Sequence, residues 1–600
     1  MKRSNYFFKI LLCFVLMISG VLMTKQDANA QVKTVTYQSR NENPITYTYD
    51  TQTGVLSFSG KGLLYAANDE DWFELDPTKI IIGEGFDSIQ RYCFNYTIHL
   101  KEVVLPESMR KIGNGAFSDC ENLETVHFPK KLTRIGSYAF SLTTALSEVH
   151  LPQTIKKIGR NAFRNSGIET LEVPKGTIVN DYAFSYCQQL KKVIYRGENI
   201  SEGLFSNCES LKSLSILSKI DSVGSKAFEK CGFSKLTLPG SVKTIDSGAF
   251  RDCKKLTSFV IPKKVTSIEK GTFRNCKKLS EITIGKHVEI IKEKAFVKCN
   301  LGELVIPGNV TTLDYGAFRK AGITSVEIED GVETIGDWAF SGNQYLNTIT
   351  IPESVSVIQE NALTQCDRLT DIYVDEENAF FTTYDGMLLS KDGTKLITCP
   401  AGKKGTVTIP SSILTLTEYS FDSCDKVTAY ALSGESELYS VKDGVLYDST
   451  GTILVRYPQG IKGWVEIPVG VVQIGAYSFS GSLADEIFIP YTTTKIGVCA
   501  FEHCNNITSI TIPGNVKTIA AAAFWSCKNL EKVTLESGCE HIRRLAFSNC
   551  KKLTAIRIPT SVSSIALTAF SDVYELTIYC PKQSMALAFA KKNWYSYKLI

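Results

Sequence analysis

The stretch Leu256-Thr-Ser-Phe-Val-Ile-Pro262 decides the fold, together with the apolar positions that follow it at Val265, Ile268, Phe273 and Cys276. It reads L-x-x-Φ-x-Φ-P-x-x-V-x-x-I-x-x-x-[AT]-F-x-x-C, where Φ is a large apolar residue. The alternation in its first half predicts a strand with one buried face. The proline ends that strand because it has no N–H to donate. A single copy cannot bury its apolar side chains, but a stack of copies can.

The same unit recurs along most of the chain, and its phenylalanine is the clearest landmark. The landmarks are Phe94, Phe117, Phe140, Phe163, Phe184, Phe205, Phe228, Phe250, Phe273, Phe296, Phe318, Phe340, Leu363, Phe421, Phe479, Phe501, Phe524, Phe547 and Phe570. Neighbouring landmarks lie 21 to 23 residues apart, except for two intervals of 58 residues. The sequence therefore predicts an α+β repeat protein, mainly β, with about 19 stacked coils.

The unit resembles the leucine-rich repeats of the BspA-like bacterial surface protein family. Copies at Ile112-Gly113, Ile135-Gly136, Ile158-Gly159 and Ile335-Gly336 carry the family's Ile-Gly…Ala-Phe signature closely. The resemblance implies a right-handed solenoid with one strand per coil, and some family members are adhesins that bind host matrix proteins. A parallel β-helix is the alternative fold, but it gives no reason for a Cys followed three residues later by Leu.

The two long intervals share a second motif, offset by 58 residues. Tyr384-Asp-Gly-Met-Leu-Leu matches Lys442-Asp-Gly-Val-Leu-Tyr, and Asp392-Gly393 between apolar runs is typical of a hairpin turn. Each interval is expected to hold a hairpin insertion of about 35 residues. The expected organisation is a signal peptide (1–30), a β cap (31–79), repeats (80–374), an insertion (375–410), a repeat (411–432), an insertion (433–468), repeats (469–580) and a C-terminal cap (581–600).

The N-terminus predicts export. Lys2, Arg3 and Lys9 precede a 14-residue apolar stretch, and Ala28-Asn-Ala30 precedes Gln31. This is the layout of a secretory signal cleaved after Ala30. Fourteen residues rise only about 21 Å as a helix, too short for the ~30 Å hydrocarbon core. We expect a secreted or surface-associated protein with no membrane span after cleavage.

Charge and composition exclude some classes of function. Among 600 residues, 66 are Lys or Arg and 62 are Asp or Glu, which gives a net charge of +4. Removing the basic signal leaves about +1, so the protein is not expected to coat nucleic acid. Hydrophobic residues at 44% and charged residues at 21% indicate a folded chain.

Cysteine is unusually frequent, and 17 of the 18 cysteines follow the predicted signal. Twelve of them occupy the third place after a landmark, namely Cys120, Cys187, Cys208, Cys231, Cys253, Cys276, Cys299, Cys366, Cys424, Cys504, Cys527 and Cys550. Stacked coils would bring them within disulfide range, and export favours disulfides. Their side chains would run parallel, however, and Thr143, Ser166, Ala321 and Asn343 replace them. A buried ladder of free thiols is therefore predicted.

Catalytic motifs are lacking in the sequence. None of the six histidines lies in a metal-binding or nucleophile motif, and Gly-x-Ser-x-Gly is absent. Cys499, His503 and Cys504 loosely resemble metal ligands, but Cys504 belongs to the thiol ladder. We expect no catalytic residue, no metal and no cofactor.

Basic residues gather in one part of the chain and are candidates for binding. From Arg251 to Asn300 there are 13 basic and 5 acidic residues. The candidates are Lys254, Lys255, Lys263, Lys264, Lys277 and Lys278. Lys254-Lys255 and Lys277-Lys278 follow successive ladder cysteines, so they are expected to share one corner of the solenoid. Stacked like charges cost about 1 kcal/mol per close pair even in water. The alternative is a solvated face.

Four other residues are candidate ligand contacts on the outward face of the strands. His127 and His150 fill the outward position of successive coils, about 5 Å apart if their strands are neighbours. They are either solvated surface residues or a pH-sensitive, ligand-touching pair. Tyr373 and Phe488 place exposed aromatic rings at the same outward position, where binding anchors are often found.

These features predict an adhesin or binding scaffold for a host matrix protein, a cell-surface protein, an anionic glycan or a wall polymer. Two alternatives remain, an exported enzyme that acts on a polysaccharide and a structural spacer of the cell envelope without a tight ligand. An enzyme needs clustered carboxylates on adjacent coils, and the outward row shows none.

Overall fold

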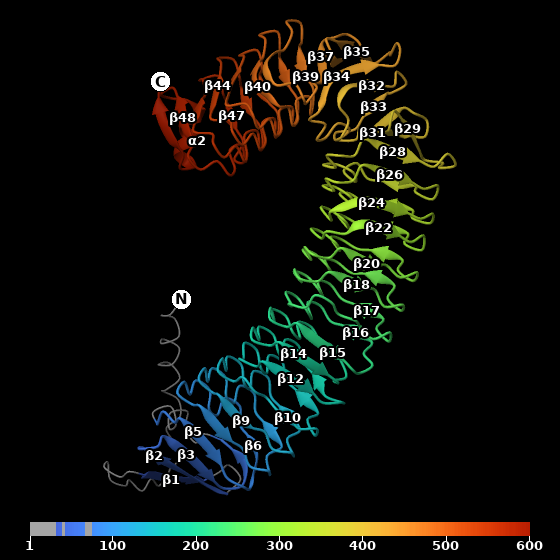
Figure 1. The fold of residues 1–600 in the computed structure, drawn as a ribbon. Helices are drawn as coiled ribbons and strands as arrows, with labels where there is room; N and C mark the ends of the chain where they lie inside the picture. The colour runs from blue at the N-terminus through green and yellow to red at the C-terminus, as the bar shows by residue number, and fades with distance from the viewer. Residues whose placement is uncertain (1–31, 39–42, 66–74) are drawn as a thin grey trace. The chain divides into compact units, whose positions relative to one another are not determined.

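The computed structural model describes residues 32–38, 43–65 and 75–600. The predicted signal peptide with its cleavage site at Ala30 lies outside these residues. The chain forms two compact units, residues 1–256 and 257–600. Within each unit, strands of successive coils lie side by side (Figure 1). The predicted leucine-rich-repeat solenoid fold is confirmed in both units.

Each regular coil carries two strands, one more than expected. The first is the predicted Leu-x-x-Φ-x-Φ strand, and the second is a short strand that contains the isoleucine about ten residues later. Both kinds pair in parallel and in register with the next coil, as in Arg134↔Lys157 and Ile135↔Ile158. In most coils the second strand is only two residues long, and one of these two residues points into the core.

The strands of the first unit are of two kinds, and each kind is divided between two sheets. Strands of the first kind follow the N-terminal strands β1 (Val32–Gln38) and β2 (Pro44–Asp50) in one sheet, as β3 (Val55–Ser59), β5 (Lys79–Ile82), β7 (Glu102–Val104) and β9 (Thr125–His127), and form a second sheet of β12 (Thr170–Val173), β14 (Lys192–Tyr195) and β15 (Ser213–Ile216). Strands of the second kind form one sheet of β4 (Gly62–Leu64), β6 (Phe86–Ile89), β8 (Lys111–Ile112), β10 (Arg134–Ile135), β11 (Lys157–Ile158) and β13 (Ile178–Val179), and another of β16 (Ser222–Val223) and β17 (Thr244–Ile245).

The second unit continues both kinds of strand. The first kind comprises β18 (Ser258–Val260), β20 (Glu281–Thr283), β22 (Gly302–Ile306), β24 (Ile323–Ile328), β26 (Thr348–Ile351), β28 (Asp371–Val374), β32 (Gly405–Ile409), β34 (Val427–Leu432), β38 (Gly463–Glu466), β40 (Ala484–Phe488), β42 (Ser509–Ile512), β44 (Lys532–Leu535), β46 (Ala555–Arg557), β48 (Thr577–Cys580) and β49 (Ser596–Leu599). The second comprises β19 (Ser267–Ile268), β21 (Ile290–Ile291), β23 (Thr312–Leu313), β25 (Thr334–Ile335), β27 (Val357–Ile358), β31 (Lys395–Thr398), β33 (Thr415–Leu416), β37 (Ile453–Arg456), β39 (Gln473–Ile474), β41 (Lys495–Ile496), β43 (Thr518–Ile519), β45 (His541–Ile542) and β47 (Ser564–Ile565).

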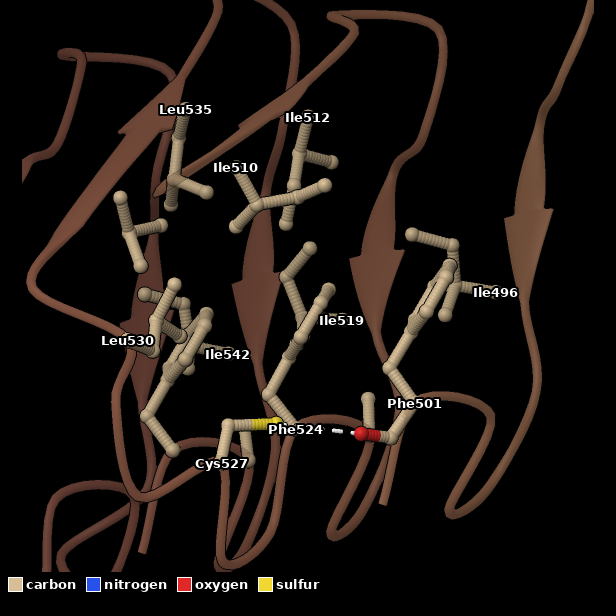
Figure 2. Close-up of a cluster of buried hydrophobic side chains, with 14 of the residues drawn as sticks. Ile496, Phe501, Ile510, Ile512, Ile519, Phe524, Cys527, Leu530, Leu535 and Ile542 are labelled. Atoms are coloured by element: carbon tan, nitrogen blue, oxygen red, sulfur yellow. Dashed lines mark hydrogen bonds between the residues drawn. The ribbon is translucent and has the colours of Figure 1, made fainter. Parts of the chain in front are cut away.

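The core of each unit is a stack of landmark phenylalanines. Phe501 and Phe524 lie with ring centroids 4.8 Å apart and planes 5° from parallel (Figure 2). The ladder cysteine explains part of this order, because the Cys527 thiol donates to the carbonyl of Phe501 in the preceding coil at 3.1 Å. The same bond recurs at Cys120, Cys208, Cys231, Cys366, Cys504 and Cys550. The thiol therefore satisfies a buried carbonyl that would otherwise lack a donor.

The two insertions are antiparallel hairpins. The first pairs β29 (Phe381–Tyr384) with β30 (Met387–Ser390), and the second pairs β35 (Tyr439–Lys442) with β36 (Val445–Asp448). The strands that follow, β31 and β37, pair antiparallel with the hairpin on one side and parallel with the next coil on the other. They are therefore part of the solenoid, and the extra segment is much shorter than the 35 residues expected.

Each 58-residue interval consequently contains one more coil than the landmarks indicated. In a regular coil the landmark N–H donates to the carbonyl before the next landmark, as from Phe117 to Ala139 at 2.8 Å. Cys399 makes the same bond to Ser420, and Tyr457 makes it to Ser478 at 2.8 Å. The Tyr457 ring also stacks on Phe479, with centroids 4.7 Å apart. Cys399 and Tyr457 thus stand where other coils place phenylalanine.

The C-terminal end carries the helix α2 (Met585–Lys592) beside β48 and β49. Ser584 caps the helix, since its hydroxyl accepts a hydrogen bond from the Leu587 N–H at 3.2 Å. Phe589 on the buried face of α2 contacts Phe570 of the last landmark edge to face. Among the residues that the structure describes, no helix is long and apolar enough to cross a membrane.

Candidate functional site

All six candidate lysines have exposed side chains. Lys254 and Lys255 lie near the end of the first unit, and Lys263, Lys264, Lys277 and Lys278 lie in the second unit. In the described part of the chain none of the six forms an ion pair. Each pair of neighbours therefore presents two unneutralised charges to solvent.

Other basic residues of the same stretch are neutralised by carboxylates. Lys292 pairs with Glu269 at 2.7 Å, and Lys270 and Lys294 both pair with Glu293. The hydrogen bonds from these two lysines hold the pKa of Glu293 below its ordinary value. Unpaired lysines are thus a property of particular positions and not of the whole basic stretch.

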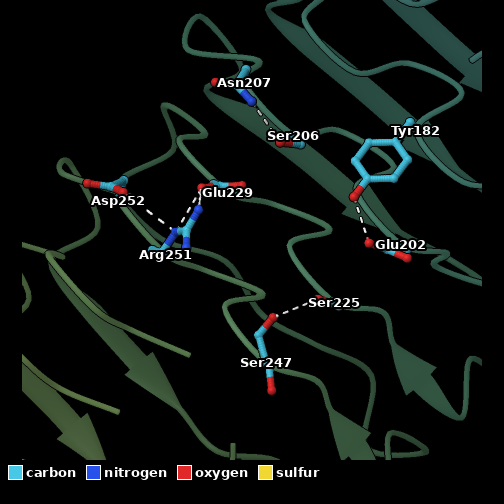
Figure 3. A network of polar contacts seen from close by, with 9 residues as sticks. All are labelled: Tyr182, Glu202, Ser206, Asn207, Ser225, Glu229, Ser247, Arg251 and Asp252. Carbon is cyan, nitrogen blue, oxygen red and sulfur yellow. Dashed lines mark hydrogen bonds and ion pairs between the residues drawn. The ribbon is translucent and has the colours of Figure 1, made fainter. Parts of the chain in front are cut away.

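Arg251, the first residue of the basic stretch, belongs to a polar network in the first unit (Figure 3). Its guanidinium donates through Nε to Glu229 at 2.8 Å, and Asp252 lies 3.8 Å from the same nitrogen. The side chain of Glu229 is nearly buried, so this arginine is held in place by a structural ion pair. It is not free to meet a ligand.

His127 and His150 are both exposed on the outward face of the first unit. His127 lies 3.9 Å from Glu102 of the preceding coil, whereas His150 lies 3.8 Å from Glu148 of its own coil. Each histidine therefore has a carboxylate as its nearest charged partner. The structure records no ladder pairing between β9 and the segment that carries His150, which makes only an isolated bridge from Glu148 to Thr170.

Tyr373 and Phe488 are exposed aromatic residues, at 53% and 52% of their surface. Tyr373 on β28 is paired with Thr350, and Phe488 on β40 is paired with Glu466 of β38. Trp464, two residues before Glu466 on the same face of β38, is 63% exposed. Sequence reasoning missed Trp464 because it assigned this residue to an insertion. The apolar alternation of Val465 and Ile467 beside Pro468 was the signal that could have placed it on a regular strand.

The cysteines are free and buried throughout the described residues, all 17 of them. Burial raises the pKa of Cys120 and of Cys366 to about 12, so both thiols stay protonated at neutral pH. A protonated, inaccessible thiol is a poor nucleophile. The predicted ladder of buried thiols therefore serves packing, and it also satisfies backbone carbonyls, which the sequence did not indicate.

Cys499, His503 and Cys504 do not converge. The Cys504 thiol donates to the Phe479 carbonyl at 3.1 Å, and the His503 ring contacts Trp525 with centroids 5.0 Å apart. Burial lowers the pKa of His503. Within the described ranges, no three His, Cys, Asp or Glu side chains are grouped as metal ligands.

These observations define the class of protein, a leucine-rich-repeat solenoid with charged and aromatic side chains on its exposed coil faces. The sequence pattern described as "BspA type Leucine rich repeat region (6 copies)" matches residues 72–191, 198–323, 315–388 and 462–577. The chain belongs to this BspA-type leucine-rich-repeat family. No curated protein matches its sequence.

Comparison with solved structures finds leucine-rich-repeat proteins from several bacteria. A leucine-rich repeat protein from Bacteroides ovatus is 18% identical, over 93% of this chain and 98% of that chain, with a TM-score of 0.28. A leucine-rich cell surface protein from Faecalibacterium prausnitzii is 19% identical over 92% and 96%, with a TM-score of 0.23. The leucine-rich repeat protein of T. pallidum is 20% identical over 35% and 86%, with a TM-score of 0.26.

Proposed function

We propose that this protein is an exported binding scaffold, an adhesin that holds a protein or a polyanionic glycan on the exposed faces of its coils. Membership of the BspA-type family supports this function, because the family consists of repeat scaffolds. One protein of similar fold is itself described as a cell surface protein. No catalytic role is assigned to any residue of the chain.

The observation that carries the proposal is that three pairs of consecutive lysines have no carboxylate partner in the described part of the chain. Nearby coils neutralise Lys270, Lys292 and Lys294 with glutamates, so the repeat readily accommodates an ion pair. Leaving Lys254-Lys255, Lys263-Lys264 and Lys277-Lys278 unpaired costs folding free energy through like-charge repulsion. A polyanionic ligand such as a sulfated glycan or a wall polymer would recover that cost on binding.

The test is the affinity of the mature protein for heparin, used as a sulfated probe. Changing Lys254, Lys255, Lys277 and Lys278 to Ser is expected to weaken binding at least tenfold. Binding by the wild type should also weaken steeply with salt, because exposed charges are screened within about 8 Å at physiological ionic strength. The matched control changes the paired Lys270 and Lys292 to Ser and should leave affinity nearly unchanged. Unchanged affinity in the four-lysine variant, or no salt dependence, contradicts the proposal.

Exposed aromatic side chains on β38 and β40 support a protein ligand on the same scaffold. Trp464 and Phe488 lie on one face of neighbouring strands, and such rings are frequent anchors of protein interfaces. Trp464→Ser with Phe488→Ser should abolish capture of an immobilised matrix protein without changing heparin binding. Loss of both activities would indicate misfolding and not a protein-binding face.

Export is part of the proposal and has its own test. Cleavage after Ala30 would give a mature chain that begins at Gln31, which N-terminal sequencing of protein from the culture medium and the cell wall checks directly. Recovery of uncleaved protein from the cytoplasm alone would contradict an adhesin function.

A further inference from the structure

The strand ladder of the first unit is interrupted beside β15, and an open groove of about 630 Å³ lies there. Two segments line it, residues 214–219 from the coil of β15 and residues 235–239 from the next coil. The volume is within the range of sites that hold small ligands or short peptide segments. The strands of the coils before it, β12, β14 and β15, can be followed side by side in Figure 1.

β15 is the edge strand of its sheet, and the next coil covers its inward residues less completely than β15 covers those of β14. β15 pairs with β14 over four residues and with no other strand. In β14 the inward residues Val193 and Tyr195 are completely buried. The corresponding residues of β15, Leu214 and Ile216, are only half-buried. Apolar surface that other coils cover is therefore open to solvent here.

The backbone of β15 is equally uncovered on this side. In a parallel sheet, alternate residues direct their N–H and C=O groups to the same neighbouring strand. The N–H groups of Ser213 and Leu217 donate to Lys191 and Tyr195 of the β14 side, at 3.2 and 2.8 Å. Ser213, Ser215 and Leu217 thus direct their backbone groups to β14. Leu214 and Ile216 alternate with them and therefore direct their backbone groups to the groove. An unpaired strand edge of this kind is a template for an added strand.

The side chains of the groove indicate which strand would fit. Leu217 lines the groove on the β15 side and is 60% exposed. Leu236 and Leu238 line the groove on the side of the next coil. Lys219 and Lys235 are both exposed, and no acidic residue lines the groove. The hydroxyl oxygen of Ser218 is buried without a hydrogen-bond partner, which leaves a polar group ready for a ligand.

We propose that this groove binds an extended acidic segment of a partner protein by β-strand addition along β15. Backbone groups of the segment would pair with those of Leu214 and Ile216. Alternate apolar side chains would pack on Leu214, Ile216 and Leu238, and carboxylates would meet Lys219 and Lys235. This site is separate from the unpaired lysines of the proposed function and requires a polypeptide, because a glycan offers no regular row of amide donors and acceptors.

The probe for the test is a short, fluorescein-labelled peptide of alternating valine and glutamate, measured by fluorescence anisotropy with the mature protein. Saturable binding is expected, and Lys219→Glu with Lys235→Glu should weaken it at least tenfold. Leu217→Asp, at an exposed position with little risk to folding, should weaken it as well. The Lys270→Ser, Lys292→Ser variant, which changes two ion-paired lysines outside the groove, is the matched control and should bind the peptide like the wild type.

A second probe keeps the outcome independent of any variant's folding. The same peptide methylated on alternate backbone nitrogens retains its charge and apolar side chains but cannot pair with β15 along one edge. Loss of binding with this peptide supports strand addition. Equal binding by the methylated peptide, displacement by heparin with no effect of the groove variants, or no binding by the unmodified peptide would overturn the proposal.

Discussion

The two insertions have the same length and the same strand plan, yet they are attached to the solenoid by different chemistry. In the first, Asn378 and Lys403 provide the polar contacts. In the second, the residues at the same offset of 58 are Ser436 and Ile461, and a buried arginine, Arg456, stands where the first insertion has Thr398. The same hairpin backbone is therefore stabilised by different side chains in the two insertions.

Asn378 anchors the first hairpin. Its side chain is completely buried and donates through Nδ2 to the carbonyls of Pro352 and Val355 at 2.8 and 2.9 Å. Its Oδ1 accepts from the N–H groups of Phe380 and Phe381, at the start of β29. Nearby, Lys403 lies 3.3 Å from Asp385 in the hairpin turn and 3.7 Å from Asp371.

Arg456 anchors the second hairpin from inside. Its guanidinium donates to the carbonyls of Ala476 at 2.7 Å, Val455 at 3.0 Å, Thr417 at 3.2 Å and Glu418 at 3.4 Å. Thr417 and Glu418 follow β33, Val455 lies on β37 itself, and Ala476 follows β39. One long cationic donor therefore contacts carbonyls of three successive coils.

The largest effect is expected at Arg456. Arg456→Met keeps most of the volume but removes the guanidinium donor from four carbonyls, of which that of Thr417 keeps the Ser420 hydroxyl as a donor, so the unfolding free energy should fall by about 3 kcal/mol or more. Thr398→Ala, at the matched position of the first insertion, should cost about 1 kcal/mol. Urea unfolding and amide exchange in β35–β37 measure the difference. A smaller loss for Arg456→Met than for Thr398→Ala would show that the buried cation is not the anchor.

Asn378 should come next. Asn378→Ala removes both the donors and the acceptor that fix the entry to the hairpin, with an expected loss of about 2 kcal/mol. Ser436→Ala in the second insertion, where the hydroxyl only accepts from the Tyr439 N–H at 3.3 Å, should cost about half as much. Thermal unfolding of the two variants compares them, and equal losses would refute a special role for the asparagine.

Lys403 should contribute less and in a salt-dependent way. Its side chain is largely buried between two aspartates that are themselves partly exposed. Lys403→Met should lower the unfolding free energy by about 1 kcal/mol at low salt, and the difference should shrink as salt is added. Ile461→Met is the matched control, for which no salt dependence is expected. If Lys403→Met lowers the unfolding free energy equally at all salt concentrations, packing of the lysine's alkyl chain, and not its charge, stabilises the hairpin.

The smallest effect is expected at Asp422, where the coil before the first insertion has Thr364. Burial raises the pKa of Asp422 above its ordinary value of 3.8. The folded state therefore binds the proton more tightly than the unfolded chain, and stability falls as pH rises through the raised pKa. Asp422→Asn should stabilise the protein by about 0.5 kcal/mol at pH 7, and this gain should vanish below pH 3.8. A gain that persists in acid would rule out ionisation as its cause.

The periodic sequence predicted the fold well because every coil needs the same kind of buried side chain at its landmark position. Phe117, Phe140 and Phe163 stand at equal spacing, and a ring that must stack on the next ring tolerates little substitution. The extra coils were missed for the same reason. Cys399 and Tyr457 replace the landmark, and only the backbone bonds to Ser420 and Ser478 show that they occupy its place.

The candidate binding residues were predicted as exposed, but their partners were not. The sequence does not show which lysine finds a carboxylate: Lys270 is paired with Glu293, and Lys277 has no ion pair in the described residues. An ion pair depends on which side chain the neighbouring coil brings within 4 Å, and a shift of one residue in a turn changes that. Trp464 was missed because the insertion was assigned too many residues.

The sequence by itself determined the repeat, the strand in each coil, the landmark stack, the buried thiols and the position of the two hairpins. Each of these follows from the spacing of apolar residues, and burial of apolar surface is the dominant driving force of folding. Tertiary structure alone decided the burial of Arg456, the pairing of individual lysines and the open groove beside β15. These depend on how closely two successive coils approach, which is set by packing between residues about 20 positions apart and leaves no periodic trace in the sequence.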